Sequence, residues 1–157
     1  MRRRVLALFA VLQFALTGTA LAQEQNAPDP AAAARGAAAG CPKLPAGSGL
    51  SWEYSQGPDF GVCYAHVAGS DENAFGIYFG YAPSFHPDQA KRIGDGRVAG
   101  KRVTWYRASN EDKPLPFARE TLLKRDSGSV SHVWVQASSQ QQLDQRLAIL
   151  DQMRFQR

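Results

Sequence analysis

The sequence predicts an α+β fold, namely a mainly antiparallel sheet of about five or six strands with one amphipathic C-terminal helix packed on one face. Three observations lead to this prediction. Short runs of alternating apolar and polar residues are separated by turn residues. Two such runs near the end of the chain flank a glycine-containing turn. The final run changes to an apolar spacing of three to four residues, which is typical of a helix that covers a sheet.

The first part of the domain predicts three strands. Their ranges are Leu50–Ser55, Phe60–Val67 and Ala74–Tyr81, with a Gly-Pro turn between the first two. In the third range, Phe75, Ile77, Phe79 and Tyr81 share one face, and the other face includes Gly76 and Gly80. We therefore expect a neighbouring group to approach the backbone closely on that face.

The middle of the chain is less regular. The range Ala82–Gly96 contains two prolines and two glycines and predicts a long loop. The range Arg97–Arg107 is rich in strand formers but is interrupted by Gly100, so it predicts either a bulged strand or a tight hairpin. The charged, proline-marked range Asn110–Pro116 predicts another loop.

The end of the chain predicts a hairpin followed by a helix. Strands Phe117–Arg125 and Ser129–Ala137 flank the turn 126–128, and Ser139 offers a helix N-cap with a glutamine three residues later. A helix over about Gln140–Met153 follows, and its apolar stripe includes Leu143, Leu147 and Leu150. This ending resembles that of secreted α/β/α sandwiches of the PsbP type. The likeness covers the hairpin and helix alone, includes no diagnostic motif and implies no function.

The N-terminus predicts an export signal. Met1–Ala22 has three arginines, an apolar core and the small residues Ala20-Leu21-Ala22 where a signal peptidase cleaves. The apolar core is short for a membrane span, which is the alternative. Cleavage would remove three of the 18 basic side chains and no acid, leaving 15 basic and 14 acidic ones. The mature chain is then nearly neutral, so we expect no nucleic-acid partner and no stable membrane insertion, and a periplasmic or secreted location.

The mature chain predicts a tether and one domain. Residues 23–40 are rich in Ala, Gly and Pro, lack an apolar stripe and predict a flexible tether, whereas residues 41–157 are long enough for one globular domain. An exported chain with two cysteines predicts the disulfide Cys41–Cys63, which should stabilise the fold by about 3 kcal/mol. A lipid-modified Cys41 and a metal site are the alternatives.

Catalytic and cofactor motifs are absent from the sequence. The three histidines, His66, His86 and His132, show no helical metal-ligand spacing, and no serine lies in a G-x-S-x-G motif. No phosphate-binding or dinucleotide-binding glycine motif occurs. We therefore expect no catalytic residue, no metal and no cofactor, although a site assembled from separated residues stays open.

The best candidate for recognition is an aromatic and cationic surface. If the two tryptophans share an outward face, it would consist of Trp105, Arg107, Arg119, His132 and Trp134 and would suit sugars, peptides or a protein partner. The alternative is that each tryptophan packs in the core. A local basic cluster at 91–102 predicts a solvated loop face, with an anion-binding surface as its alternative.

Together these features predict an exported, periplasmic, non-enzymatic binding or protein-interaction module. The ligand class and biological process are not specified by any motif. The alternative is a small periplasmic hydrolase whose site is assembled from separated residues.

Overall fold

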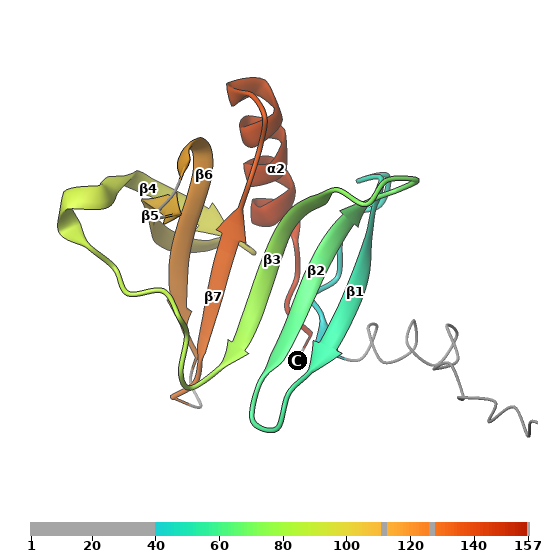
Figure 1. Cartoon of the computed structure of the whole chain (residues 1–157). Coiled ribbons are helices and arrows are strands. Elements are labelled where there is room, and N and C mark those ends of the chain that lie inside the picture. Colours follow the sequence, from blue (N-terminus) through green and yellow to red (C-terminus); the bar gives the residue numbers. More distant parts are fainter. Residues whose placement is uncertain (1–39, 111–112, 126–127, 157) are drawn as a thin grey trace, which may run out of the picture.

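The computed structural model describes residues 40–110, 113–125 and 128–156. Its strands form one antiparallel sheet in the order β1-β2-β3-β7-β6-β5-β4 (Figure 1). The seven strands are β1 (Leu50–Gln56), β2 (Gly61–Val67), β3 (Asn73–Gly80), β4 (Arg92–Val98), β5 (Lys101–Asn110), β6 (Lys113–Lys124) and β7 (Val130–Val135). The 3-10 turn η1 spans Gln89–Lys91, and the helix α2 spans Gln140–Gln152.

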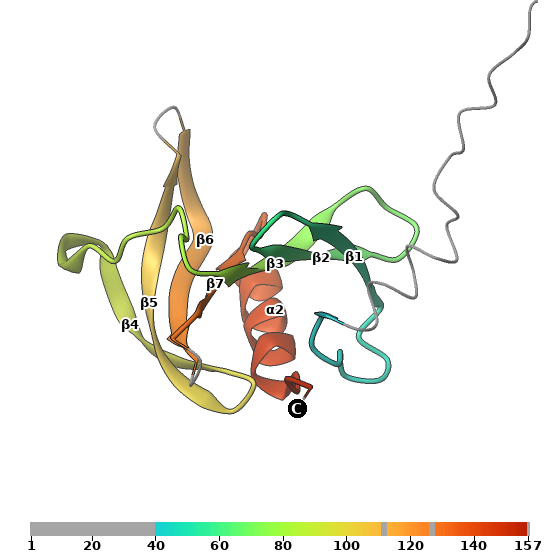
Figure 2. The ribbon, with the colours of Figure 1, turned by 90° about the horizontal axis from the view of Figure 1, so that it is seen from below.

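The helix lies against one face of the sheet, as the sequence predicts (Figure 2). Ser139 caps its first turn, because the hydroxyl accepts a hydrogen bond from the Gln142 amide. The buried side of α2 carries Leu143 and Leu150, which pack with apolar residues of the sheet. Leu147 is half-buried at the edge of this contact.

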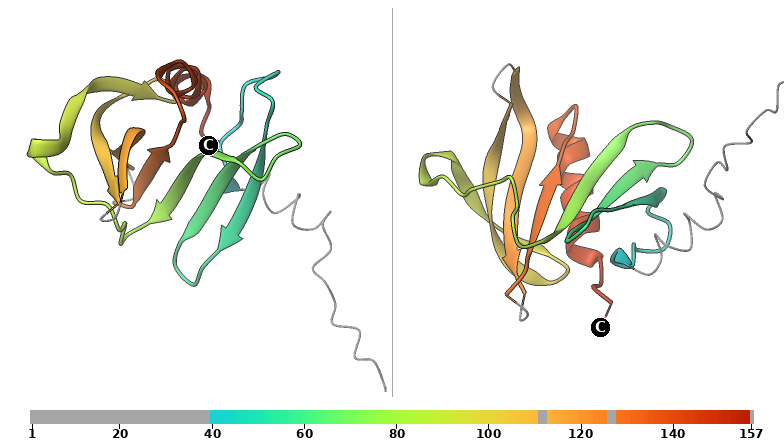
Figure 3. Two further views of the ribbon diagram at one scale, coloured as in Figure 1. Left: turned by 45° about the horizontal axis from the view of Figure 1, so that its top comes forward. Right: turned by 60° about the horizontal axis from the view of Figure 1, so that its bottom comes forward.

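The sheet is curled, so that its β4 edge reaches the helix (Figure 3). The β4–β5 turn consists of Ala99 and Gly100, both with positive φ, and this is the geometry of a tight two-residue hairpin turn. The Ala99 amide donates to Leu150 O and the Gly100 amide to Asp151 O. The turn thus binds carbonyl groups in the last turn of α2, where helices lack intrahelical donors.

The rest of the helix-side face is covered by the two ends of the described domain. The disulfide Cys41–Cys63 joins the segment 41–49 to β2, with the Cα atoms 5.8 Å apart. Trp52 donates its indole N–H to Pro42 O at 2.7 Å, and Phe155 packs edge-on against Phe79. The predicted disulfide is therefore confirmed, and it fastens the start of the domain over the core.

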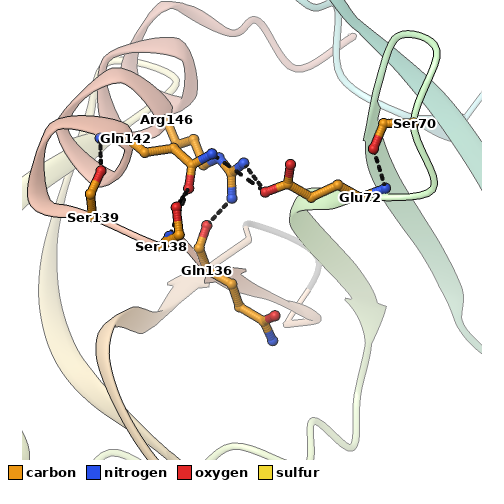
Figure 4. A network of polar contacts seen from close by, with 7 residues as sticks. All are labelled: Ser70, Glu72, Gln136, Ser138, Ser139, Gln142 and Arg146. Carbon is orange, nitrogen blue, oxygen red and sulfur yellow. Dashed lines mark hydrogen bonds and ion pairs between the residues drawn. The ribbon is translucent and has the colours of Figure 1, made fainter.

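A polar network fastens the start of α2 to the sheet (Figure 4). Arg146 is buried on the inner side of the helix, although an arginine was not expected there. Its guanidinium donates to Gln136 O and lies 2.6 Å from a carboxylate oxygen of Glu72. Gln142 accepts a hydrogen bond from the Ser138 amide at 2.7 Å. This network ties the β2–β3 connection, the end of β7 and α2 together.

The fold class is confirmed, with seven strands in place of the expected five or six. The additional strand is β4, most of which lies in the range 82–96 that was predicted to be a loop. In the next range, 97–107, the tight hairpin is the alternative that the structure confirms. Strand β6 begins at Lys113, earlier than expected, although a loop was predicted there. Among the described residues no second helical layer covers the sheet, so the α/β/α likeness does not extend to the architecture.

The predicted signal peptide and nearly all of the predicted tether lie outside the described residues. No helix within the described ranges is long and apolar enough to cross a membrane.

Candidate functional site

The sheet face opposite α2, called the open face below, carries a row of paired residues that crosses all seven strands. Because cross-strand partners point to the same side of a sheet, these residues share one face. From β4 to β1 the row is Arg92, Tyr106, Glu120, Trp134, Gly76, Tyr64 and Glu53. The adjacent row contributes His132 and Tyr78, which are also cross-strand partners. Aromatic rings therefore dominate the middle of the open face.

Gly76 shapes this aromatic surface. The indole of Trp134 lies across the β3 backbone, and a Cβ atom at Gly76 would stand 2.0 Å from its Cζ2 atom. No side chain larger than hydrogen fits there without displacing the ring. The indole then meets Tyr64 edge-on at a centroid distance of 5.9 Å. Both rings are half-buried, so they keep an exposed part on the open face.

A hydrogen-bonded pair, His132 and Glu120, lies next to Trp134. His132 Nε2 is 2.8 Å from Glu120 Oε2, and the His132 ring is 5.3 Å from the Trp134 ring. Phe85, from the loop 81–91, stacks on His132 with an interplanar angle of 21° and also contacts Tyr106. His132 is therefore only 6% exposed, even though it points to the face without the helix.

A polar pocket, called the loop pocket below, opens beside Phe85 where the loop 81–91 passes the ends of β5 and β6. Its volume is about 400 Å³. The lining residues are Ser84, Phe85, His86, Lys91, Arg107 and Glu120. The pocket thus combines an apolar ring, a hydroxyl, an imidazole, two cations and one carboxylate.

Two arginines are cross-strand neighbours, and one of them, Arg107, is among the residues that line this pocket. Arg107 of β5 pairs in register with Arg119 of β6. The Arg119 guanidinium donates to Pro116 O at 2.8 Å and to Ala118 O at 2.9 Å. Partial burial, together with the like charge of Arg107, lowers the pKa of Arg119. Within the described ranges, neither arginine forms an ion pair with an acidic side chain.

The structure brings two of the predicted surface residues together on the open face and places the other three in rows of the opposite face. His132 and Trp134 share the open face, whereas Arg107 and Arg119 are cross-strand neighbours in the row that contains Val135 of the core. Trp105 lies on the opposite face, is 5% exposed and belongs to the apolar core. The single surface predicted from both tryptophans is therefore not formed, because adjacent strand positions point to opposite faces and Tyr106, not Trp105, aligns with Trp134.

Sequence reasoning missed several residues of this site. Phe85 and Ser84 lie in a loop whose path over the sheet depends on strand order, which local patterns do not encode. Tyr64 and Tyr106 lie on predicted strands, but their position beside Trp134 or Phe85 depends on which strands pair. The one feature of the sequence that pointed to this site is Gly76, where a neighbouring group was expected to approach the backbone. The Trp134 ring lies there, so this expectation is confirmed.

A second pocket, of about 440 Å³, lies near the start of α2 and is lined in part by Glu72, Gln136 and Arg146. Its charged groups already pair with each other, so they serve the fold. No three His, Cys, Asp or Glu side chains of the described residues gather closely enough to hold a metal ion.

No protein-family model, no curated protein and no solved structure matches this chain.

Proposed function

We propose that this chain is an exported, periplasmic binding module and that its ligand contacts the open face of the sheet around Trp134 and Tyr64. The observation that carries the proposal is the difference between the two faces. One face is filled by α2 and the domain ends, whereas the other displays half-buried aromatic rings and is crossed, among the described residues, by the loop 81–91. Aromatic side chains of this kind supply much of the contact energy in binding sites.

The proposed export is supported by the pattern of Met1–Ala22 and by the disulfide, since disulfides persist in oxidising compartments. We expect the protein from an extracytoplasmic fraction to begin at Gln23. Intact-mass analysis measures this directly, and a membrane-bound chain that still begins at Met1 would contradict export with cleavage.

The test of the binding face uses two tryptophan variants. Saturation-transfer NMR with a panel of aromatic acids, disaccharides and tripeptides detects binding to the whole domain. We expect the binding found with wild type to be lost in Trp134→Val and kept in Trp105→Phe, which alters the core and leaves the open face intact. Circular dichroism confirms that both variants are folded. Binding that survives Trp134→Val and disappears in Trp105→Phe would contradict the proposal.

A small hydrolase is the second candidate, and the His132–Glu120 pair favours it. A histidine oriented by a carboxylate is the usual general base of serine hydrolases. However, Phe85 stacks on the ring, and in the described part of the chain no hydroxyl or thiol is hydrogen-bonded to His132. Turnover in an esterase, peptidase and glycosidase screen, abolished by His132→Gln, would establish the hydrolase and overturn the binding module.

A further inference from the structure

We propose that the open face binds a small solute with a quaternary ammonium group, and that the cation lies between the rings of Trp134 and Tyr64. The space between these two rings is called the ring corner below. This inference rests on the proposed binding function, because it names the class of ligand that the open face takes.

The first observation is that the Trp134 ring lies face down on β3. A Cβ atom at Gly76 would stand 2.0 Å from Cζ2, 2.4 Å from Cε2 and 2.6 Å from Cη2 of the indole. Similar distances to three adjacent ring atoms mean that the backbone meets the face of the ring and not its edge. The opposite face of the indole therefore points away from the sheet, and the exposed part of this half-buried side chain lies there.

The second observation is the orientation of Tyr64 beside this ring. The planes of the two rings are inclined by 70°, and their centroids are 5.9 Å apart. Since the indole lies flat on the strand, the Tyr64 ring stands nearly upright next to it, and the two rings form the floor and one wall of a corner. A cation is attracted to an aromatic face when it lies within about 6 Å of the ring centroid, and tryptophan is the strongest such partner.

The third observation is that carboxylates flank the ring corner on both sides. Glu53 is the cross-strand partner of Tyr64, and Glu120 is the cross-strand partner of Trp134. The four adjacent strands β1, β2, β3 and β7, which include the ring corner, contain no Lys or Arg. This part of the open face therefore attracts positive charge.

Two basic side chains of the open face lie farther away. Lys124 pairs with Val130, which is four residues or about 13 Å along β7 from Trp134. Arg92 is three strands or about 14 Å from Trp134, and it forms an ion pair with Asp95 at 2.9 Å. Both separations exceed the screening length of about 8 Å at physiological ionic strength, so these side chains repel a cation in the ring corner only weakly.

The two carboxylates differ in their access to a ligand. The Glu53 side chain is 67% exposed, whereas Glu120 is 17% exposed and shares the loop pocket with Lys91. Glu53 therefore supplies more of the negative charge that a ligand meets, and it is the carboxylate to test.

The contacts of these carboxylates favour a cation without N–H groups. Glu53 Oε2 is 2.9 Å from His66 Nε2, and Glu120 Oε2 is 2.8 Å from His132 Nε2. Each carboxylate thus contacts an imidazole and acts on the ring corner through its charge. A quaternary ammonium group needs no hydrogen-bond acceptor and is a usual ligand of aromatic sites. The same carboxylates disfavour an attached anion, so a solute of the choline type suits the site better than a phosphocholine headgroup.

The test is an NMR titration with choline at constant ionic strength, observed at the Trp134 indole and the Tyr64 ring. We expect saturable shifts of both signals. The matched probe is 3,3-dimethylbutan-1-ol, which has the shape of choline and no charge, and it should bind about fivefold more weakly or worse because the cation–π attraction is lost. Phosphocholine should also bind more weakly than choline.

A charge variant tests the carboxylate separately. Glu53→Gln should lower the affinity for choline about two- to fivefold, and more than the affinity for the neutral probe, because an exposed negative charge is removed. The matched control is Asp144→Asn, which removes the same charge from the exposed side of α2, where Asp144 accepts a hydrogen bond from Gln140. This control should leave both affinities unchanged.

The outcomes separate the cation site from the binding face. Equal affinities for choline and its neutral probe, with shifts at Tyr64 and Trp134, would overturn the cation site while leaving the binding face in place. A choline response that does not saturate, tighter binding of phosphocholine, or equal effects of Glu53→Gln and Asp144→Asn would also overturn the cation site.

Discussion

At the scale of single residues, two glycines mark the places where tryptophans lie flat on the sheet. Gly76 receives the Trp134 ring on the open face, and a Cβ atom at Gly96 would stand 2.4 Å from Trp105 Nε1 on the helix side. The sequence shows that Gly76 leaves space on one face of its strand, but it does not show which ring fills that space. The partner is 58 residues away and is fixed only by the pairing of β3 with β7.

This close approach gives the first prediction. Gly76→Ala should lower the free energy of unfolding by about 1–3 kcal/mol, because the new methyl group displaces the Trp134 ring. In a Trp134→Val background the same change should cost less than about 1 kcal/mol, because the ring atoms it meets are gone. Urea unfolding of the four proteins measures the coupling. Gly94→Ala is the control, since its Cβ has open space. Equal costs in both backgrounds would contradict the account.

At the scale of elements, the helix and the C-terminal hairpin follow from local patterns, whereas β4 does not. The helix has a cap, a buried stripe and a preceding strand that sequence periodicity identifies. Strand β4 contains two glycines in its seven residues, which lowers local strand propensity. The long-range contact with Trp105 requires Gly96, so tertiary packing overrides the local preference. Tertiary contacts also explain why Arg146 lies on the buried face of α2. Its guanidinium pairs with Glu72 and donates to Gln136 O, and these contacts offset the cost of burying its charge.

The β4–β5 turn gives the second prediction. Ala99 has a φ of 51°, a conformation that costs about 1 kcal/mol for a residue with a Cβ. Ala99→Gly should therefore raise the free energy of unfolding by about 0.5–1 kcal/mol, since the hydrogen bonds to α2 use only the backbone. The matched control is Ala148→Gly in the exposed helix interior, which should lower it by about 1 kcal/mol. Thermal and urea unfolding measure both changes. A loss of stability in Ala99→Gly would show that the turn is not under strain.

At the scale of the whole molecule, the order of the strands decides where the candidate site lies. The connection 81–91 leaves β3 near the middle of the sheet and reaches β4 at its edge, so it must pass β7, β6 and β5. That passage places Phe85 on His132 and creates the loop pocket. The fold class and the disulfide could be predicted because they depend on periodicity and cysteine count. The site could not, because it depends on which strands pair.

The disulfide gives a third prediction for the whole domain. It fixes the segment 41–49 over the core, so replacing both cysteines in Cys41→Ala/Cys63→Ala should lower the free energy of unfolding by about 3 kcal/mol. Ser48→Ala, in the same segment, should change it by less than about 0.5 kcal/mol, because its hydroxyl accepts a long hydrogen bond, of 3.4 Å, from the Leu50 amide. Urea unfolding compares the three proteins. An unchanged midpoint in the cysteine-free variant would show that the bond does not stabilise the domain.

The most direct test of the binding face is a map of amide and indole NMR shifts on addition of the tightest ligand from the panel. The open-face account expects the largest changes at Tyr64, Gly76 and the Trp134 indole, with the Trp105 indole and the amides of α2 unchanged. Changes centred on α2 or on the Trp105 indole would contradict it.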